Sequence, residues 1–270
     1  MPELPEVQTV VSNLAPKIKN KTILDYREFW HKVNYTQNNS ILKKEINKLK
    51  IIDVDRKGKY IIIILKKYYL VFHLRMTGYL HVLNKLPKNR KHMRCYFKLT
   101  DSYFLIFEDI RKFGGFYFLK DLEFINKKIG IDALDEKLTL NYLFQKTSKI
   151  NRKIKYFLLD QKYICGLGNI YIDEILWDCK IHPEKISSKI KKNKINDLIH
   201  SIKKNLNKSI KHHGTTILNF KFDNMKSGNY KSKLKAYGLD DTPCYRCKNK
   251  IIKKKICGRS SFYCPSCQKL

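Results

Sequence analysis

The segment CYRCKNKIIKKKICGRSSFYCPSC, residues Cys244–Cys267, sets the architecture at the C-terminal end of the chain. It contains two Cys-x2-Cys pairs, separated by 16 residues, and each pair can place two thiolates on one tight turn. Apolar and polar residues alternate between the pairs, which predicts a β-hairpin. Two turns brought together by a hairpin make a tetrahedral zinc site. We therefore expect one structural Zn²⁺, with the ligands Cys244, Cys247, Cys264 and Cys267.

Disulfide bonds are the alternative use of these cysteines. An intracellular setting and the lysine-rich hairpin argue against disulfides. Three other cysteines, at positions 95, 165 and 179, lie among apolar residues and are expected to be small core side chains. Cys257 falls inside the hairpin, out of register with either pair, and is expected to have no role in the site.

The basic charge of the chain extends from the hairpin over its whole length. There are 56 Lys and Arg residues against 24 Asp and Glu, a net charge of +32. Such a surface attracts polyanions, and nucleic acid is the commonest such partner. Compositional bias is the alternative, because only nine of the basic residues are Arg and because Lys, Ile and Asn are abundant throughout. Neither a membrane-spanning stretch nor a signal peptide is recognisable, so we expect an intracellular protein without a membrane partner.

A chain of 270 residues suits about two domains. Helical spacing of apolar residues predicts a first helix over residues 5–20, and a strand pattern follows from Ile51 to Leu119. Helical periodicity returns at residues 138–144, 153–159, 170–177 and 195–210. We expect a mainly β domain at 2–125, a linker at 126–142, a helical domain at 143–236 and the zinc finger at 237–270.

A glycine-containing turn precedes one of these helices, in the sequence Cys165-Gly166-Leu167-Gly168-Asn169-Ile170. Two glycines separated by one residue let backbone N–H groups approach a phosphate at a helix N-terminus. Short glycine connections are common between helices, so this motif alone is weak. In a strongly basic chain with a zinc hairpin it favours contact with a DNA backbone.

The N-terminus, Met1-Pro2-Glu3-Leu4-Pro5-Glu6, offers a nucleophile if Met1 is removed. The free proline amine could attack a sugar C1′ and form an iminium that acidifies the C2′ hydrogen. Glu3 and Glu6 could then move protons or stabilise the developing cation. Proline and acidic residues are also ordinary at a helix start, which is the simpler interpretation of these six residues.

Two further segments, HLRMTG at His73–Gly78 and DIRKFGG at Asp109–Gly115, each follow an expected strand. Their Met, Arg and Phe side chains could belong to a core or to hairpins. In a DNA-binding protein they could instead form a wedge, because an enzyme that acts on a base extrudes it and fills the gap.

Together these segments resemble bacterial formamidopyrimidine-DNA glycosylase. The resemblance also includes Arg56-Lys57-Gly58-Lys59-Tyr60, the segment from Gly166 to Glu174, the step Gly214-Thr215-Thr216, and the zinc module through Gly258-Arg259-Ser260-Ser261-Phe262-Tyr263-Cys264. It extends in the family's order from residue 2 to residue 269.

The resemblance implies an α+β multidomain fold: an N-terminal β-sandwich with flanking helices, and a helical C-terminal domain with a helix-two-turns-helix and the zinc finger. It also implies a bifunctional DNA glycosylase and abasic-site lyase of the bacterial cytosol, active on damaged double-stranded DNA. A cleft that must admit bent duplex favours a monomer. Such an enzyme removes 8-oxoguanine and formamidopyrimidines through a proline iminium and β,δ-elimination. By the same resemblance, the catalytic residues are Pro2, Glu3 and Lys59; the residues filling the gap are Met76, Arg111 and Phe113; and the phosphate contacts are His73, His92, Asn169 and Arg259.

The chain departs from the family pattern in three places. Residues 224–230 match the family's lesion-covering segment only in part, Leu239 stands where the family tends to have Arg, and Ile131-Asp132-Ala133 replaces a linker that contains Pro. Three other interpretations stay open from the sequence alone. These are an endonuclease VIII-type enzyme acting on oxidised pyrimidines, a zinc-finger DNA-binding protein without catalysis, and a ribosome- or RNA-associated zinc ribbon.

Overall fold

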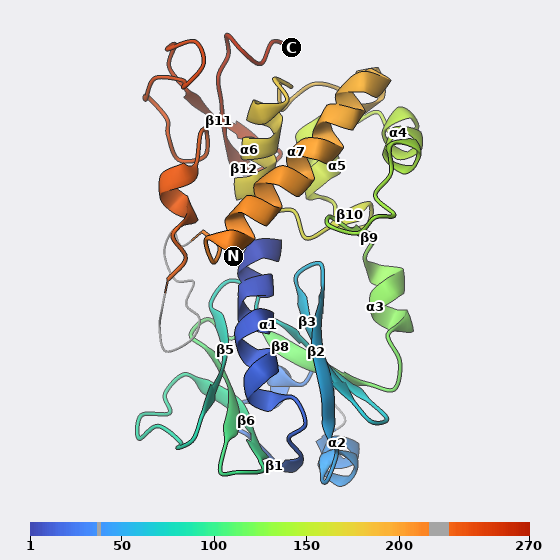
Figure 1. Ribbon diagram of the computed structural model, residues 1–270, viewed down its shortest axis with the longest axis vertical. Helices are drawn as coiled ribbons and strands as arrows, with labels where there is room; N and C mark the ends of the chain where they lie inside the picture. The colour runs from blue at the N-terminus through green and yellow to red at the C-terminus, as the bar shows by residue number, and fades with distance from the viewer. Residues whose placement is uncertain (37–38, 216–226) are drawn as a thin grey trace. The chain divides into compact units, whose positions relative to one another are not determined.

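The computed structural model describes residues 1–36, 39–215 and 227–270 and divides into two compact units. Unit 1 consists of Met1–Asn126 together with the described part of His212–Asn229. Unit 2 consists of Lys127–Lys211 and Tyr230–Leu270, and it includes the zinc-finger hairpin. The chain thus leaves unit 1, builds most of unit 2, and returns to unit 1 before completing unit 2 (Figure 1).

Unit 1 is a sandwich of two four-stranded antiparallel sheets, as expected. One sheet has the order β1-β6-β7-β5 and the other the order β2-β3-β4-β8. The strands of the first sheet are β1 (Ile23–Glu28), β6 (Met93–Leu99), β7 (Phe104–Asp109) and β5 (Gly78–Leu83). Those of the second are β2 (Ile51–Lys57), β3 (Tyr60–Leu65), β4 (Tyr69–His73) and β8 (Gly115–Leu119).

Aromatic side chains from both sheets fill the core of unit 1. The Phe97 ring on β6 lies 6.1 Å from that of Phe72 and 5.4 Å from that of Phe116, measured between ring centroids. Helix α1 (Leu4–Ile18) packs an apolar face against the same core. Its apolar residues recur at helical spacing, which explains why this segment forms a helix. The unit also contains η1 (His31–Val33) and α2 (Asn39–Ile46), and α3 (Glu123–Lys128) begins in unit 1 and ends in unit 2.

Unit 2 is helical, with the zinc-finger hairpin at its C-terminal end (Figure 1). Its helices are α4 (Leu140–Ser148), α5 (Ile154–Leu159), α6 (Asn169–Asp178) and α7 (Lys192–Lys211), with the short turns η2 (Ser187–Lys189) and η3 (Tyr230–Lys233). The predicted hairpin is confirmed as β11 (Ile252–Ile256) paired antiparallel with β12 (Arg259–Tyr263). None of the helices in these described ranges is long and apolar enough to cross a membrane.

The segment Ile131-Asp132-Ala133 has a defined structure. Strand β9 (Ile131–Asp132) pairs in parallel with β10 (Ile164–Cys165), and the Ala133 N–H donates to the Cys165 carbonyl at 3.0 Å. These bonds fix the start of unit 2 to the strand that leads into the glycine turn. The residues expected to form a linker therefore belong to a short two-stranded ladder.

Candidate functional site

The N-terminal residues Pro2 and Glu3 are buried where helix α1 begins. Glu3 is the N-cap residue, and its backbone N–H donates to Oε2 of Glu6 at 2.8 Å. Oε1 of Glu6 accepts the backbone N–H of Thr215 at 2.6 Å. Gly214 has a φ of +83°, and a Cβ added there would lie 2.8 Å from the same Glu6 oxygen. Glu6 therefore holds backbone groups at the N-terminus and at residue 215, a role that the sequence did not indicate.

Lys59 is buried in the turn that joins β2 to β3. Gly58 has a φ of +57°, a conformation that glycine adopts without strain. Arg56 braces this turn, since its Nη1 donates to the Gly58 carbonyl at 3.0 Å and its Nε donates to Oε1 of Gln8 at 2.9 Å. Gln8 lies on α1, so the turn that carries Lys59 is fixed to the helix whose start carries Pro2 and Glu3.

His73 ends strand β4 and is buried against Tyr60, with ring centroids 4.8 Å apart. Its Nδ1 accepts the backbone N–H of Arg75 at 3.0 Å. A neutral imidazole that accepts at Nδ1 carries its proton on Nε2, where it can donate to a phosphate oxygen. His92 is half-buried, and its carbonyl accepts the backbone N–H of Asp109 at 2.9 Å.

Met76, Arg111 and Phe113 lie together, on two loops that are far apart in sequence. Nη1 of Arg111 lies 3.1 Å from the Met76 sulfur, and its guanidinium carbon lies 4.7 Å from the centre of the Phe113 ring. Met76 is 44% and Phe113 50% exposed, unusual for large apolar side chains in a well-filled unit. We call this group the wedge.

Asn169 begins helix α6 in unit 2, with Gly168 as its N-cap. Gly166 has a φ of +107°, and Gln161 braces the turn by accepting the Gly166 N–H and donating to the Leu167 carbonyl, both at 2.9 Å. Nδ2 of Asn169 donates to the Ser260 carbonyl at 2.8 Å, while its buried Oδ1 has no partner among the described residues. Exposed Arg259 precedes Ser260, so Asn169 and Arg259 are joined through β12.

Two charged residues that support this arrangement received no role from the sequence. Nζ of Lys155 lies 2.6 Å from Oδ1 of Asp173, and both side chains are completely buried, at 0% and 1% exposure. Oδ2 of Asp173 accepts the backbone N–H of Phe262 at 3.0 Å, which attaches β12 to α6. Burial raises the pKa of Asp173 to about 7, while Lys155 and the Phe262 N–H oppose that rise. A lysine inside the apolar run Ile154–Leu158 was the available signal.

Glu174 follows on the same helix and supports the other side of the zinc module. Its carboxylate accepts the backbone N–H groups of Lys235, Ala236 and Tyr237, each at 2.8 Å. Burial raises the pKa of this carboxyl, and the three N–H donors oppose the rise. Adjacent acidic residues on α6 thus hold the segment before the first Cys-x2-Cys pair and the hairpin between the two pairs.

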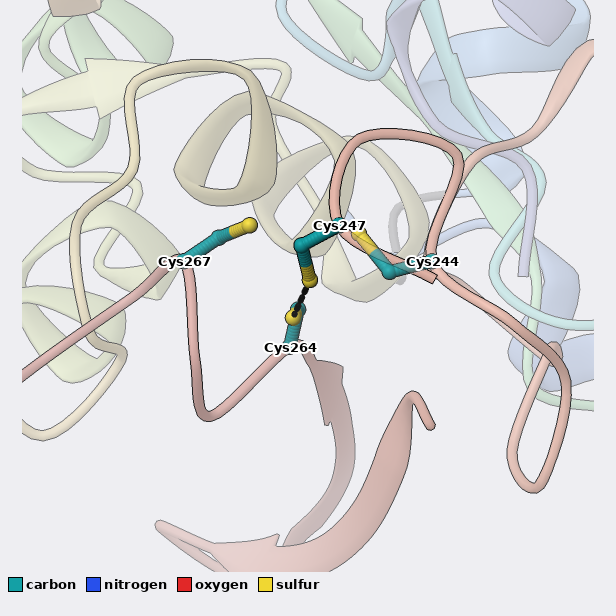
Figure 2. A group of neighbouring side chains, drawn as sticks. All are labelled: Cys244, Cys247, Cys264 and Cys267. Atoms are coloured by element: carbon teal, nitrogen blue, oxygen red, sulfur yellow. Dashed lines mark hydrogen bonds between the residues drawn. The ribbon is translucent and has the colours of Figure 1, made fainter. Parts of the chain in front are cut away.

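The expected zinc ligands form one cluster, shown in Figure 2. The sulfur atoms of Cys244, Cys247, Cys264 and Cys267 all lie within 4.8 Å of one another, and all eight cysteines of the chain are free thiols. Burial acts to raise the pKa of Cys244, but N–H donors, including Trp177 Nε1 at 3.4 Å, lower it to about 6. Four thiolates this close repel one another unless a soft cation lies between them. The donor set therefore fits a tetrahedral metal site.

The lesion-covering segment expected at 224–230 is described only from Ser227 onward; residues 224–226 and Thr216 lie outside the described residues. The flanking residues of that segment meet in unit 1. The Asn229 N–H donates to the His212 carbonyl at 3.0 Å, and Thr215 and Asn229 form an antiparallel bridge. Thr215 and Asn229, which flank the segment, are therefore paired with each other next to Glu6.

Comparison with known proteins gives the same family over both units. Residues 1–116 match the formamidopyrimidine-DNA glycosylase N-terminal domain, and residues 129–221 match the formamidopyrimidine-DNA glycosylase H2TH domain. A formamidopyrimidine-DNA glycosylase from Pelotomaculum thermopropionicum is 38% identical over 276 residues, covering 100% of each chain.

Two solved structures of the Lactococcus lactis protein have the same fold. A complex with DNA containing an abasic site is 34% identical, with a TM-score of 0.91 over 99% of this chain and 100% of that one. A variant bound to DNA containing Fapy-dG is 35% identical, with a TM-score of 0.92 over 100% of both chains.

Proposed function

The chain belongs to the formamidopyrimidine-DNA glycosylase family, and we propose that Pro2 is its nucleophile, with Glu3 and Lys59 moving protons. The protein is a DNA glycosylase and abasic-site lyase of base-excision repair that removes oxidised purines. The observation that carries the residue assignment is the full-length match to relatives of this family together with the burial of Pro2 and Glu3 at the start of α1.

The first step uses the amine that Pro2 gains when Met1 is removed. An α-amino group has a pKa of about 7.7–8.0, so a useful fraction of it is neutral at physiological pH. The nitrogen lone pair attacks C1′ of the damaged nucleotide while the glycosidic bond breaks, and the base leaves with the electron pair of that bond. Glu3 supplies the proton that assists this cleavage.

The second step cuts the strand at the same centre. Opening of the sugar ring leaves an iminium between Pro2 and C1′, and this cation acidifies the C2′ hydrogen. Loss of that proton expels the 3′ phosphate, and a further elimination expels the 5′ phosphate. Lys59 acts as a second proton donor and as a phosphate ligand. Its burial in a turn fixed to α1 supports that role.

DNA contacts are proposed on both units. The wedge would occupy the gap left by an extruded nucleotide, with Arg111 reading the orphaned cytosine. His73, with Nε2 as donor, and His92 would contact phosphates from unit 1. Asn169 and Arg259 would contact them from unit 2, where the Asn169–Ser260 bond supports their joint action.

We assign Zn²⁺ to the four-cysteine cluster, because four thiolates form a closed tetrahedral site that serves structure rather than chemistry. The ion would hold the β11–β12 hairpin and with it Arg259. We further propose a monomer that acts on damaged double-stranded DNA in the bacterial cytosol. The DNA present in the similar solved structures supports that partner.

Borohydride trapping on a duplex with 8-oxoguanine opposite cytosine tests the nucleophile. Reduction of the iminium would fix the DNA covalently to the protein, and peptide mapping by mass spectrometry would locate the adduct on Pro2. Pro2→Gly is expected to lower strand cleavage by several orders of magnitude, and a form that retains Met1 is expected to behave likewise. Normal turnover by either protein would contradict the assignment.

A parallel duplex with an oxidised pyrimidine separates the substrate classes. Faster trapping on the pyrimidine would indicate an endonuclease VIII-type preference. No adduct on either duplex, despite a free Pro2 and measurable binding, would indicate a DNA-binding relative without catalysis.

A further inference from the structure

The wedge loops connect the two sheets of unit 1 at one end of the sandwich. One loop, residues 74–77, joins β4 to β5, and the other, residues 110–114, joins β7 to β8. The strand residues that flank them are paired, His73 with Gly115 in one sheet and Gly78 with Asp109 in the other. The two loops therefore run side by side between the same pair of sheets.

Each wedge loop contains a left-handed residue that is not glycine. Arg75 has a φ of +54° and Lys112 a φ of +56°. Such conformations persist where surrounding bonds determine the backbone. The wedge side chains are poorly placed to supply that support, because Met76 and Phe113 are about half exposed, and Arg111, which contacts both, lies on one of the same two loops.

Asp109 supplies the support from inside the unit. Its side chain is 0% exposed. Oδ2 accepts the backbone N–H groups of Phe113 at 2.8 Å and Gly114 at 2.7 Å, and Oδ1 accepts that of Arg111 at 3.1 Å. Oδ1 also accepts the Thr77 hydroxyl, which belongs to the other loop. A single carboxylate thus binds the backbone of one wedge loop and a side chain of the other.

Tyr35 supplies a second connection from the outer side. Its hydroxyl donates to the Phe113 carbonyl at 2.7 Å, and its backbone N–H donates to the Phe116 carbonyl at 2.8 Å. Burial raises the pKa of the Tyr35 hydroxyl, while a hydrogen bond and charge from Arg75 oppose the rise, so Arg75 lies beside it. A Cβ on Gly115 would lie 2.3 Å from the Val33 carbonyl oxygen and 3.0 Å from the Tyr35 ring, so glycine is needed beside this tyrosine.

We propose that Asp109 and Tyr35 are positioning residues that hold Met76, Arg111 and Phe113 at the spacing required to replace an extruded base and to read the base opposite. The inference rests on the proposed function of the wedge. A wedge that is already ordered before it meets DNA pays less conformational entropy on insertion. The hydrogen bonds of Asp109 and Tyr35 go to the wedge loops and β8, so we expect the chemistry at Pro2 to stay intact when either residue is altered.

The decisive comparison is between two substrates that differ in their need for the wedge. An intact 8-oxoguanine–cytosine pair must be unpaired and unstacked, whereas an abasic nucleotide has no base to extrude. We would measure single-turnover excision of 8-oxoguanine opposite cytosine and opposite adenine, and strand cleavage at a preformed abasic site. The variants are Tyr35→Phe, which removes one hydroxyl, and Asp109→Asn, which keeps the shape but removes the charge.

Tyr35→Phe is expected to slow 8-oxoguanine excision by about two- to tenfold, the effect of one lost hydrogen bond. The same variant should reduce the preference for cytosine over adenine and leave abasic-site cleavage within about twofold of the wild type. Asp109→Asn should act in the same direction and more strongly, because it weakens several bonds. Tyr103→Phe, at the β6–β7 turn under Lys21, is the matched control and should change none of these rates.

An equal loss on all substrates would show that the residues only stabilise unit 1, and it would overturn the inference. Unchanged rates and unchanged opposite-base preference in a variant would exclude that residue from the role. Failure of the nucleophile assignment looks different, because the wild-type protein itself would then give no Pro2 adduct on any substrate.

Discussion

At the scale of single residues, the Lys155–Asp173 pair shows how the fold attaches its zinc module. Both ions are removed from water, which costs several kcal/mol for each ion, and only close contact and further hydrogen bonds offset that cost. Nζ of Lys155 also lies 3.4 Å from the Ser260 carbonyl, and Asp173 receives the Phe262 N–H. The pair therefore fixes the part of β12 that carries Arg259.

Lys155→Met is expected to destabilise unit 2 by about 3–5 kcal/mol, because it leaves Asp173 buried without a counter-ion. Denaturant unfolding of the zinc-loaded protein at pH 8 measures this change in the free energy of unfolding. Lys153→Met is the matched control, since Lys153 pairs with Glu184 at a half-exposed site and should lose only about 0.2–1 kcal/mol. The double change Lys155→Met with Asp173→Leu should recover much of the loss.

The same variant has a defined dependence on pH. Burial raises the folded-state pKa of Asp173 to about 7, well above its ordinary value, and loss of Lys155 raises this pKa further. A carboxyl whose pKa is higher in the folded than in the unfolded state lowers the free energy of unfolding as the pH rises. This loss begins near pH 4, about the unfolded pKa, and is complete above the folded pKa. The loss in free energy of unfolding caused by Lys155→Met should thus be smaller at pH 6 than at pH 8. A loss that does not depend on pH would show that the buried charge of Asp173 is not its cause.

At the scale of elements, the β11–β12 hairpin depends on the metal and on α6 together. Cys264→Ser is expected to abolish stoichiometric zinc and to weaken DNA binding roughly tenfold or more, because charge-assisted contacts of about 1.5–3 kcal/mol each are lost with Arg259. Metal analysis and a binding titration measure both effects. Cys257→Ser is the control within the same hairpin, since Cys257 lies outside the cluster. Full zinc content and affinity in Cys264→Ser would refute the structural role.

Elements with simple periodicity were predictable from the sequence. Helix α1, the strand Tyr60–Leu65 and the zinc hairpin all follow from spacing, and all are confirmed. Strand β1 was not predicted, because a bulge between Ile23 and Asp25 breaks its alternation of buried and exposed residues. The ladder between β9 and β10 was also missed, since two residues on each strand give no periodic signal and pair only through tertiary contacts.

The supporting residues of the site were harder to find than its functional residues. Asp109 stood inside a segment singled out for Arg111 and Phe113, yet its role depends on loop bonds that no spacing reveals. Tyr35 is far from both wedge loops in sequence and is brought to them by its bonds to Phe113 and Phe116. The four-cysteine cluster, by contrast, could be predicted, because metal geometry constrains the sequence spacing of the ligands directly.

At the scale of the whole molecule, the net charge of +32 should control binding to DNA. Each neutralised phosphate contributes a slope of about −0.9 to a plot of log affinity against log salt concentration. Arg259→Ala should reduce the magnitude of that slope by about one, and nearly equally for damaged and undamaged duplexes. Arg27→Ala is the control, because Arg27 is exposed in unit 1 and paired with Asp25. An unchanged slope in Arg259→Ala would remove Arg259 from the phosphate contacts.

The adjacent positions of Asp173 and Glu174 have a consequence for exchanging parts between relatives. Asp173 accepts a hydrogen bond from the β11–β12 hairpin, and Glu174 accepts hydrogen bonds from the segment at 235–237. The four-cysteine zinc finger is therefore attached to α6 at two neighbouring positions. A single residue inserted earlier in α6 would rotate both carboxylates by about 100° around the helix axis. Both sets of hydrogen bonds to the zinc finger would then be lost. A zinc finger transplanted from another family member should therefore form these contacts only when the recipient helix has its two acidic residues at the same positions along α6.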